Sequence, residues 1–266
     1  MAETIEVLYY VDAGAEAVTR RAAQYFVDGI RAASGARGKA RIAISGGHTP
    51  KNTFALLADP SAQYREQIPW ENLELYWVDE RCVPPDHPDS NYRMTREAML
   101  DKVPLDKSQV FRIQGELDPD EAASKYESAI RQSFRLEGAE MPVFDLLALG
   151  MGPDGHTASL FPHTQGLHEL MRIAIANHVP QQKETWRVTL TSPVINRARD
   201  VFFLIEGQDK VAALKQVFTG SYDPETYPSQ LIRPASHRIT LILDAVAASA
   251  LPPPGASGVG RLEIQR

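Results

Sequence analysis

Cysteine and long apolar runs are what this chain of 266 residues most clearly lacks, since Cys82 is its only cysteine. A single cysteine excludes an intrachain disulfide and a cysteine-rich metal site. No segment approaches the roughly 18 consecutive apolar residues of a membrane-spanning helix. The first residues, MAETIEVLYYVDAGAE, lack the basic start and long apolar stretch of a secretory signal, so a cytoplasmic protein is expected.

Basic residues are also in short supply, with 28 Lys and Arg against 34 Asp and Glu and a formal net charge of −6. This balance provides no basic surface for nucleic acid or for an anionic membrane. An anionic small molecule would need locally placed arginine and lysine side chains that act against the field of the whole protein. The sequence is equally consistent with a monomer and a homodimer.

What the chain does have is a regular alternation of short apolar runs and helical stretches. Val18, Ala22, Phe26 and Ile30 recur at a spacing of four, which is typical of one buried helix face. Strands are expected at residues 5–11, 41–45, 73–78, 144–150, 172–179, 186–191, 201–207 and 239–244. Helices are expected at 15–33, from Pro50, from Ser90 or Asn91 to about Leu100, at 119–135 and at 208–218.

This alternation predicts a single doubly wound α/β domain over residues 1–250, with a mainly parallel sheet flanked by helices. Residues 251–266, LPPPGASGVGRLEIQR, are rich in proline and glycine and are expected to form a flexible tail. In such sheets ligands bind beyond the carboxyl ends of the strands. The residues that follow each strand are therefore the first candidates for a functional site.

The strand at 41–45 ends in Ser45, Gly46 and Gly47, with Thr49 at the start of the next helix. Bare backbone N–H groups at a helix N-terminus favour an anion, most often phosphate, and the two hydroxyl groups can add donors. A plain strand–helix turn that needs glycine for positive φ accounts for the same residues equally well. His48, in the same turn, is more typical of a surface histidine than of a catalyst.

The strand at 73–78 runs into Asp79-Glu80-Arg81. An arginine here can bind phosphate through two N–H groups, and an acid can orient a water or a sugar hydroxyl, although a surface ion pair explains the segment by itself. Lys210 follows the strand at 201–207 and can supply a point charge to phosphate or lie in solvent on an amphipathic helix. Cys82 is expected to be a small buried apolar side chain.

The segment LLALGMGPDGHTASLFP contains Gly150-x-Gly152-x-x-Gly155, the pattern of a dinucleotide-binding loop. Such a loop should be followed about 20 residues later by an acid that holds the ribose, but IAIANH stands there. Asp154 would also bring negative charge close to a pyrophosphate. The glycines are therefore interpreted as a tight turn that directs Asp154 and His156 into a cleft, where the histidine acts as a general base.

Other hydrolytic and nucleotide-binding chemistries lack their motifs. The sequence has no Gly-x-Ser-x-Gly elbow, no His-Glu-x-x-His pair and no P-loop. His163 and His168 follow the glycine-rich segment at uneven spacing and make a weak case for a metal.

Taken together, four segments resemble the motifs of the 6-phosphogluconolactonases: SGGHTP, VDERCVPPDHPDSNY, LGMGPDGHTASLFP and EGQDKVAALK. They occur in the family's order, and the resemblance extends from about residue 5 to residue 247. It implies a carboxylic ester hydrolase that converts 6-phospho-D-glucono-1,5-lactone to 6-phosphogluconate, in the oxidative pentose phosphate pathway, without a cofactor or a required metal. The expected partner is the sugar-phosphate lactone alone.

The resemblance also implies roles for individual residues. His156 falls at the general base, with Asp79 and Asp154 as polar partners. The positions expected to hold the substrate phosphate are those of Ser45, Gly46, Gly47, Thr49, Arg81 and Lys210. Backbone N–H groups near Gly152 or Gly155 are candidates to stabilise the oxyanion. The sequence does not decide whether His48 or Arg187 contacts the ligand.

Two alternatives remain on the same fold. A hexosamine-phosphate deaminase or isomerase would use Asp79 to move a proton between carbons, and a non-catalytic sensor would bind a sugar phosphate without turnover. One departure from the family pattern is His163, which stands where Leu-Phe-Pro is usually followed by glycine. If that position has positive φ, His163 is expected to be strained.

Overall fold

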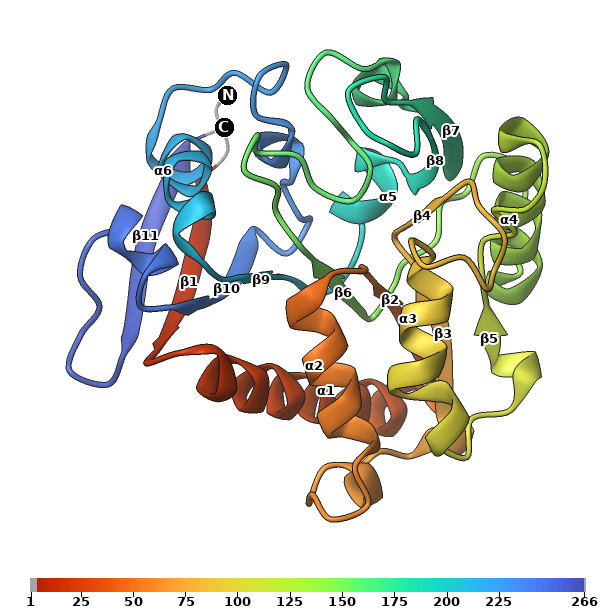
Figure 1. Cartoon of the computed structure of the whole chain (residues 1–266), viewed down its shortest axis with the longest axis horizontal. Helices are drawn as coiled ribbons and strands as arrows, with labels where there is room; N and C mark the ends of the chain where they lie inside the picture. Colours follow the sequence, from red (N-terminus) through yellow and green to blue (C-terminus); the bar gives the residue numbers. More distant parts are fainter. Residues whose placement is uncertain (1–3, 266) are drawn as a thin grey trace.

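The computed structural model describes residues 4–265 and is built around one large sheet (Figure 1). Eight strands follow one another in the order β11 (Val259–Gln265), β1 (Thr4–Asp12), β10 (Arg238–Asp244), β9 (Val201–Ile205), β6 (Leu146–Leu149), β2 (Ala40–Ile44), β3 (Leu73–Trp77) and β5 (Val110–Phe111). All neighbouring pairs are parallel except β11 with β1. The mainly parallel, doubly wound α/β class is thereby confirmed.

Helices flank the sheet and close its core. They are α1 (Ala15–Arg37), α2 (His48–Ala58), α3 (Asn91–Ala98), α4 (Pro119–Phe134), α5 (Ser192–Asn196) and α6 (Val211–Thr219). In Figure 1, α1 and α2 lie below the central strands and α5 and α6 lie above them. The expected inner face of α1 is confirmed, because Val18, Ala22, Phe26 and Ile30 are all buried. Residues 4–265 contain no helix long and apolar enough to cross a membrane.

A second sheet was not expected from the sequence. It has three antiparallel strands in the order β4 (Asp79–Arg81), β8 (Trp186–Leu190) and β7 (Ala174–His178). Val78 connects the two sheets, since its N–H donates to the Ile44 carbonyl in the large sheet and its carbonyl accepts from the Leu190 N–H in the small one. The chain therefore leaves β3 and enters β4 at one residue.

The expectation of a flexible tail is wrong for residues 259–265, which form β11 and pair with β1 along their length. Gly260, Leu262 and Ile264 alternate with exposed residues, which is the period of a strand with one covered face. The proline- and glycine-rich residues before β11 form its connection, where the Gly255 N–H donates to the Val259 carbonyl. The domain thus extends beyond residue 250.

The carboxyl ends of β2 and β6 mark the point where the strand order reverses. From β2 the chain continues outward to β3 on one side, and from β6 it continues to β9 and β10 on the other. Loops leave a doubly wound sheet in opposite directions at such a point and leave a crevice between them. The segments beginning at Ser45 and Gly150 follow these two adjacent strands.

Candidate active site

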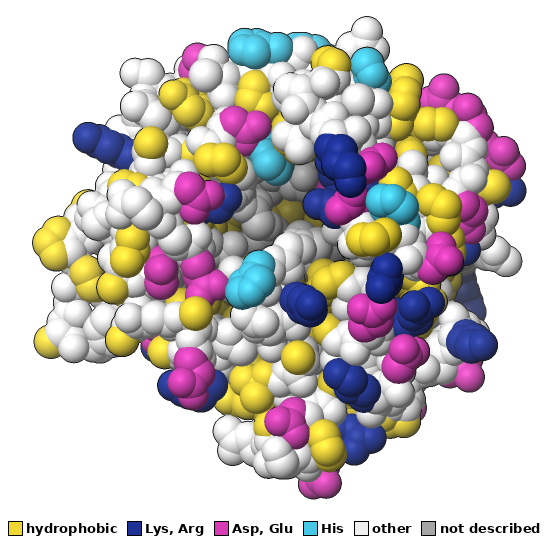
Figure 2. Space-filling view, viewed as in Figure 1, with side chains coloured by type: hydrophobic (Ala, Val, Ile, Leu, Met, Phe, Trp, Pro, Cys, Tyr) yellow, Lys and Arg dark blue, Asp and Glu magenta, His cyan; other side chains and the backbone are white. Residues whose placement is uncertain are grey.

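A cleft of about 560 Å³ opens at this switch point, and Figure 2 shows the surface hollowed near the centre of the view. Its volume is within the range of small-molecule sites. Eight of the nine predicted site residues line it, namely Ser45, Gly46, Gly47, Thr49, Asp79, Arg81, His156 and Lys210. The ninth, Asp154, is hydrogen-bonded to His156. The structure therefore brings the predicted residues together.

The Ser-Gly-Gly turn places open backbone at the start of α2. Gly47 precedes the helix with φ 119°, in the region that favours glycine. Gly46 must lack a side chain for another reason, because a Cβ there would lie 1.8 Å from Asn91 Oδ1. The Ser45 hydroxyl is buried and has no hydrogen-bond partner within the described chain. A helix N-terminus with a spare hydroxyl beside it is suited to an anion.

Two arginines form the cationic wall of the cleft. Arg81 on β4 and Arg187 on β8 are register partners, and Arg187 is 6% exposed. Burial lowers the pKa of Arg187 and the charge of Arg81 lowers it further. Arg81 Nε is buried without a partner among residues 4–265. Two like charges held side by side with an unused donor indicate a site for an anionic group.

Backbone carbonyls hold these arginines in place. Arg81 Nη1 donates to the Asp89 carbonyl at 2.5 Å, and Arg187 Nε donates to the Glu184 carbonyl at 2.8 Å. Sequence reasoning left Arg187 undecided because its pairing with Arg81 is set by the second sheet. The structure places it in the lining of the cleft.

Lys210 reaches the cleft from the start of α6, where its side chain is 22% exposed and its Nζ lies 2.9 Å from Asp209 Oδ2. Thr49 lies in the same lining, and its hydroxyl donates to the Glu206 carboxylate. The other oxygen of Glu206 is buried without a partner in the part of the chain described. Glu206 had not been predicted, and the single acid before Gly207 gave no pattern by which to find it.

The glycine-rich segment forms a tight turn around His156. The Gly152 N–H donates to the His156 carbonyl at 2.9 Å, and Gly155 has φ 77°. A Cβ on Gly152 would lie 2.1 Å from His156 Nδ1, so the ring needs a glycine at this position. The ring also stacks on Phe161 with centroids 3.9 Å apart. The glycines at 152 and 155 are therefore needed to make room for the His156 ring and to close the turn that carries it.

Asp154 fixes the histidine in one orientation. Its Oδ1 lies 2.6 Å from His156 Nδ1 and also accepts the backbone N–H of His156 at 3.1 Å. Burial alone would raise the pKa of Asp154, but its hydrogen bond to His156 and the attraction between the two groups hold that pKa below its ordinary value. An ionised carboxylate can only accept, so Nδ1 carries the hydrogen and the neutral ring keeps its lone pair on Nε2.

The expected oxyanion donors are already engaged. The Gly152 N–H donates to His156 and the Gly155 N–H donates to the Gly152 carbonyl at 3.0 Å. Both groups close the turn itself, so neither of these two N–H groups is free to stabilise an oxyanion in this conformation, and the role of the neighbouring N–H groups stays a prediction.

Asp79 is held by a serine that sequence reasoning missed. Ser159 Oγ donates to Asp79 Oδ2 at 2.7 Å, and Asn91 Nδ2 donates to the Asp79 carbonyl at 3.0 Å. Ser159 is fully buried and its N–H donates to Thr189 Oγ1 on β8. Its place three residues after His156 was the one available signal. Ser159 therefore ties the histidine loop to the second sheet.

Glu80 has a structural role, because its carboxylate accepts the N–H groups of Asn91 and Tyr92 at the start of α3. Cys82 is half-buried, and burial, together with the charge of Glu80, raises the pKa of its thiol to about 12, which disfavours the reactive thiolate. His48 is exposed but lines the cleft.

His163 has φ 59°, so the condition for strain at this position, which departs from the family pattern, is met.

A doubly wound sheet with an anion-binding loop at its switch point and a carboxylate-supported histidine beside it is the arrangement of an α/β enzyme for a small anionic substrate. Residues 13–241 match the family of glucosamine-6-phosphate isomerases and 6-phosphogluconolactonase. The chain therefore belongs to this family.

Its similarity to individual members covers most of the chain. It is 42% identical to the 6-phosphogluconolactonase of Synechocystis over 218 residues, which are 82% of this chain and 87% of that protein. It is 41% identical to the human 6-phosphogluconolactonase over 68% of this chain and 69% of the human protein. The solved structure of the enzyme from Trypanosoma cruzi superposes with a TM-score of 0.79 at 30% identity, covering 91% of this chain and 96% of that one.

Proposed function

We propose that the chain is a 6-phosphogluconolactonase, which hydrolyses 6-phospho-D-glucono-1,5-lactone to 6-phospho-D-gluconate in the oxidative pentose phosphate pathway. The observation that carries this proposal is the pairing of two features in one cleft. His156, supported by Asp154, lines the cleft that Arg81 and Arg187 also line. A lactone with a distant phosphate is a substrate that needs both a base for water and a cationic grip.

The phosphate is held by the cationic wall and the α2 turn. Arg81, Arg187 and Lys210 supply positive charge, while the Ser45 hydroxyl and the backbone at Gly46 and Gly47 supply neutral donors. Binding the phosphate away from the reacting carbon fixes the lactone in one orientation, and this remote binding energy lowers the barrier at the carbonyl.

The histidine activates water. Nε2 of neutral His156 accepts a proton from a water molecule as that water attacks C1 of the lactone, and the carbonyl π electrons move to oxygen. Collapse of the tetrahedral intermediate breaks the bond from C1 to the ring oxygen, which takes the proton back from His156. Asp154 stabilises the imidazolium that forms in between. General base catalysis of this kind contributes about 10²–10⁴-fold in rate.

Asp79 adds a polar group to the wall of the cleft. Its Oδ2 accepts a hydrogen bond from Ser159, and its other oxygen can accept a hydrogen bond from a sugar hydroxyl. The chemistry calls for no cofactor and no metal ion. We assign the protein to the cytoplasm as a monomer or homodimer that acts on the free sugar-phosphate lactone, without nucleic acid or membrane partners.

The direct test compares two substrates of the family. Purified protein is mixed with freshly prepared lactone and, separately, with glucosamine 6-phosphate. We expect lactone loss far above its spontaneous hydrolysis and no ammonia from the amino sugar. Ammonia release without accelerated lactone loss would show instead a deaminase that uses Asp79. Tight binding of 6-phosphogluconate without either reaction would show a sensor.

A further inference from the structure

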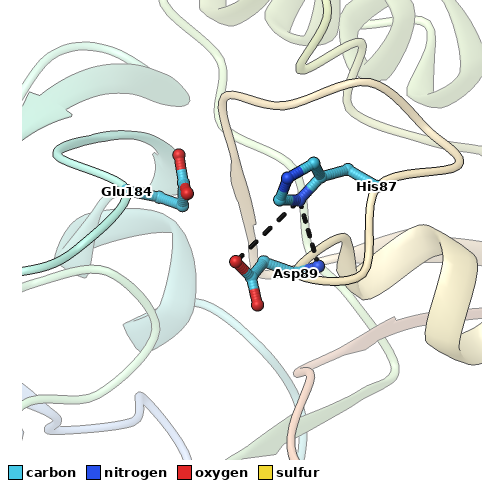
Figure 3. Close-up of side chains that lie close together, drawn as sticks. All are labelled: His87, Asp89 and Glu184. Atoms are coloured by element: carbon cyan, nitrogen blue, oxygen red, sulfur yellow. Dashed lines mark hydrogen bonds and ion pairs between the residues drawn. The ribbon is translucent and has the colours of Figure 1, made fainter.

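Two loops meet at the rim of the cleft and bring together three side chains that can bind a metal ion. His87 and Asp89 lie between β4 and α3, and Glu184 lies between β7 and β8. One possible ligand atom from each lies within 4.8 Å of the others, and all three residues are half-buried. Figure 3 shows the imidazole and the two carboxylates around a common space.

A lysine side chain bridges the two carboxylates of this space. Lys183 Nζ lies 2.8 Å from Asp89 Oδ2 and 3.7 Å from Glu184 Oε1, but its side chain is 78% exposed. An ion pair this exposed contributes little to stability. The Lys183 ammonium lies between the two carboxylates, so the position of a cation is already defined here.

We propose that His87, Asp89 and Glu184 bind a divalent transition-metal ion, with Zn²⁺ as the best match. One imidazole and two carboxylates form a ligand set that zinc accepts, with water in the fourth position. Zinc bonds to nitrogen and oxygen of about 2.0–2.2 Å need ligand atoms about 3.3 Å apart, so the side chains close in by rotation and Lys183 swings into solvent.

His87 Nδ1 accepts a hydrogen bond from the Asp89 N–H at 3.2 Å and lies 3.9 Å from Asp89 Oδ2. The lone pair of this nitrogen is directed toward the Asp89 N–H, beside the Asp89 carboxylate. Zinc takes the place of the N–H donor at that lone pair, and coordination replaces one weak hydrogen bond.

The metal site is linked to the anion-binding arginines through the backbone of its own ligands. Asp89 and Glu184 are the two residues whose carbonyls accept from Arg81 and Arg187. A metal ion that joins the two side chains therefore also fixes the separation of the two carbonyls and hence of the guanidinium groups. This second step rests on the proposed function, and it predicts that zinc lowers the KM for the phosphorylated lactone without changing kcat.

The experiment uses the full-length chain without a histidine tag, first freed of metal with a chelator. Calorimetric titration with ZnCl₂ is expected to give one-to-one binding. His87→Ala and Glu184→Gln should lose this binding, and so should Asp89→Asn, which keeps the carbonyl that holds Arg81. His156→Ala should retain it, which excludes binding at the catalytic histidine. His168→Ala, at a surface histidine outside the cluster, is the matched control.

Undiminished one-to-one binding in the His87→Ala and Glu184→Gln variants would overturn the proposal, and so would a wild-type protein that takes up no zinc. Thermal unfolding without zinc checks that each variant is folded. For the link to the arginines, we expect a KM about fivefold lower with zinc, at the low end of measured site–site coupling. An unchanged KM would refute that link. A chain with no lactonase activity would refute the proposed function, while the titration would still decide the metal site.

Discussion

A histidine can take a proton from water at neutral pH only when one ring nitrogen keeps its lone pair, and this depends on the group bonded to the other nitrogen. Here an ionised Asp154, two residues away in the chain, holds Nδ1 at 2.6 Å. The stacked ring of Phe161 limits rotation out of that position. A base oriented from both sides loses little entropy when it acts, which favours proton transfer along one direction.

Replacing the base is the clearest residue-scale test. His156→Ala should lower kcat by about 10²–10⁴-fold, the contribution of a general base. Binding of 6-phosphogluconate, measured by calorimetry, should stay within a few-fold of wild type because the phosphate contacts remain. A variant with normal turnover would remove His156 from its role. His168→Ala, on the surface, is the control for loss of a histidine as such.

The arginines should behave differently, because in the proposed function they bind the phosphate equally in the ground and transition states. Arg81→Ala and Arg187→Ala are each expected to raise KM by about tenfold or more, with a smaller change in kcat. Steady-state kinetics at fixed ionic strength measure both constants. Lys51→Ala removes an exposed cation of α2 outside the cleft lining and should change neither. A purely kcat effect in the arginine variants would contradict their assignment.

Single residues in the loops after the strands were predictable because their positions in the sequence, directly after apolar runs, locate them at the sheet edge. Ser45, Asp79 and His156 each follow an apolar run that ends at the sheet edge, and the topology of a doubly wound sheet then brings them together. Arg187 and Ser159 were not predictable, because their partners Arg81 and Asp79 lie far away in the chain. No local periodicity specifies which strand will pair with which.

At the scale of elements, the histidine loop and the second sheet depend on each other through Ser159. Its hydroxyl bonds the Asp79 carboxylate of β4, its N–H bonds Thr189 of β8, and its carbonyl accepts from Asn177 of β7. One buried residue thus contacts all three strands of the small sheet. The loop that carries the base is positioned by the same strands that carry Asp79 and Arg81.

Removing that hydroxyl should therefore affect both stability and activity. Ser159→Ala leaves a buried carboxylate oxygen without its donor, which costs about 1–3 kcal/mol in the free energy of unfolding. Urea unfolding measures that loss, and kcat should fall as Asp79 becomes free to move. Ser128→Ala, on the exposed side of α4, is the matched control and should change little. A wild-type kcat in Ser159→Ala would limit the serine to a structural role.

Strand existence was easier to predict than strand partnership. The apolar runs at β2, β3, β6, β9 and β10 form strands that are buried on nearly every residue, as is typical of strands covered on both faces, while β1 alternates buried and half-buried residues. β11 was missed because its proline- and glycine-rich approach is typical of a disordered end, while the short alternation of Gly260, Leu262 and Ile264 is weak. The backbone hydrogen bonds to β1 stabilise a strand that the local sequence alone does not indicate.

At the scale of the whole molecule, β11 protects the edge of the large sheet. It covers β1 with an antiparallel ladder from Thr4–Gln265 to Tyr10–Val259. Without it, β1 would present a row of unpaired backbone groups to solvent, which is a template for aggregation. Three strands lie between β11 and β6, so the loss of β11 should leave the cleft intact.

Truncation after Gly258 should thus lower the thermal midpoint by several degrees and increase light scattering on heating, while the remaining monomer keeps a kcat near that of wild type. Differential scanning calorimetry and a lactonase assay measure the two effects. Glu263→Ala, which changes an exposed residue of β11 and keeps the ladder, should behave like wild type. An unchanged midpoint after truncation would show that β1 needs no cover.

The protein has a net charge of −6, so the anionic substrate of the proposed function approaches a molecule of the same sign. The cationic wall of the cleft has to outweigh that repulsion at short range. Its contribution is local, since salt screens charges over about 8–10 Å at physiological ionic strength.

The three residues of β4 carry a further consequence, because successive side chains of a strand point to opposite faces. Asp79 and Arg81 line the cleft, while Glu80 between them turns toward the start of α3. Inserting or deleting one residue just after Val78 would exchange these faces. The cleft would then present a glutamate in place of an arginine, and the first N–H groups of α3 would lose the Glu80 carboxylate that accepts their hydrogen bonds. The spacing of this short segment is therefore as essential as its composition.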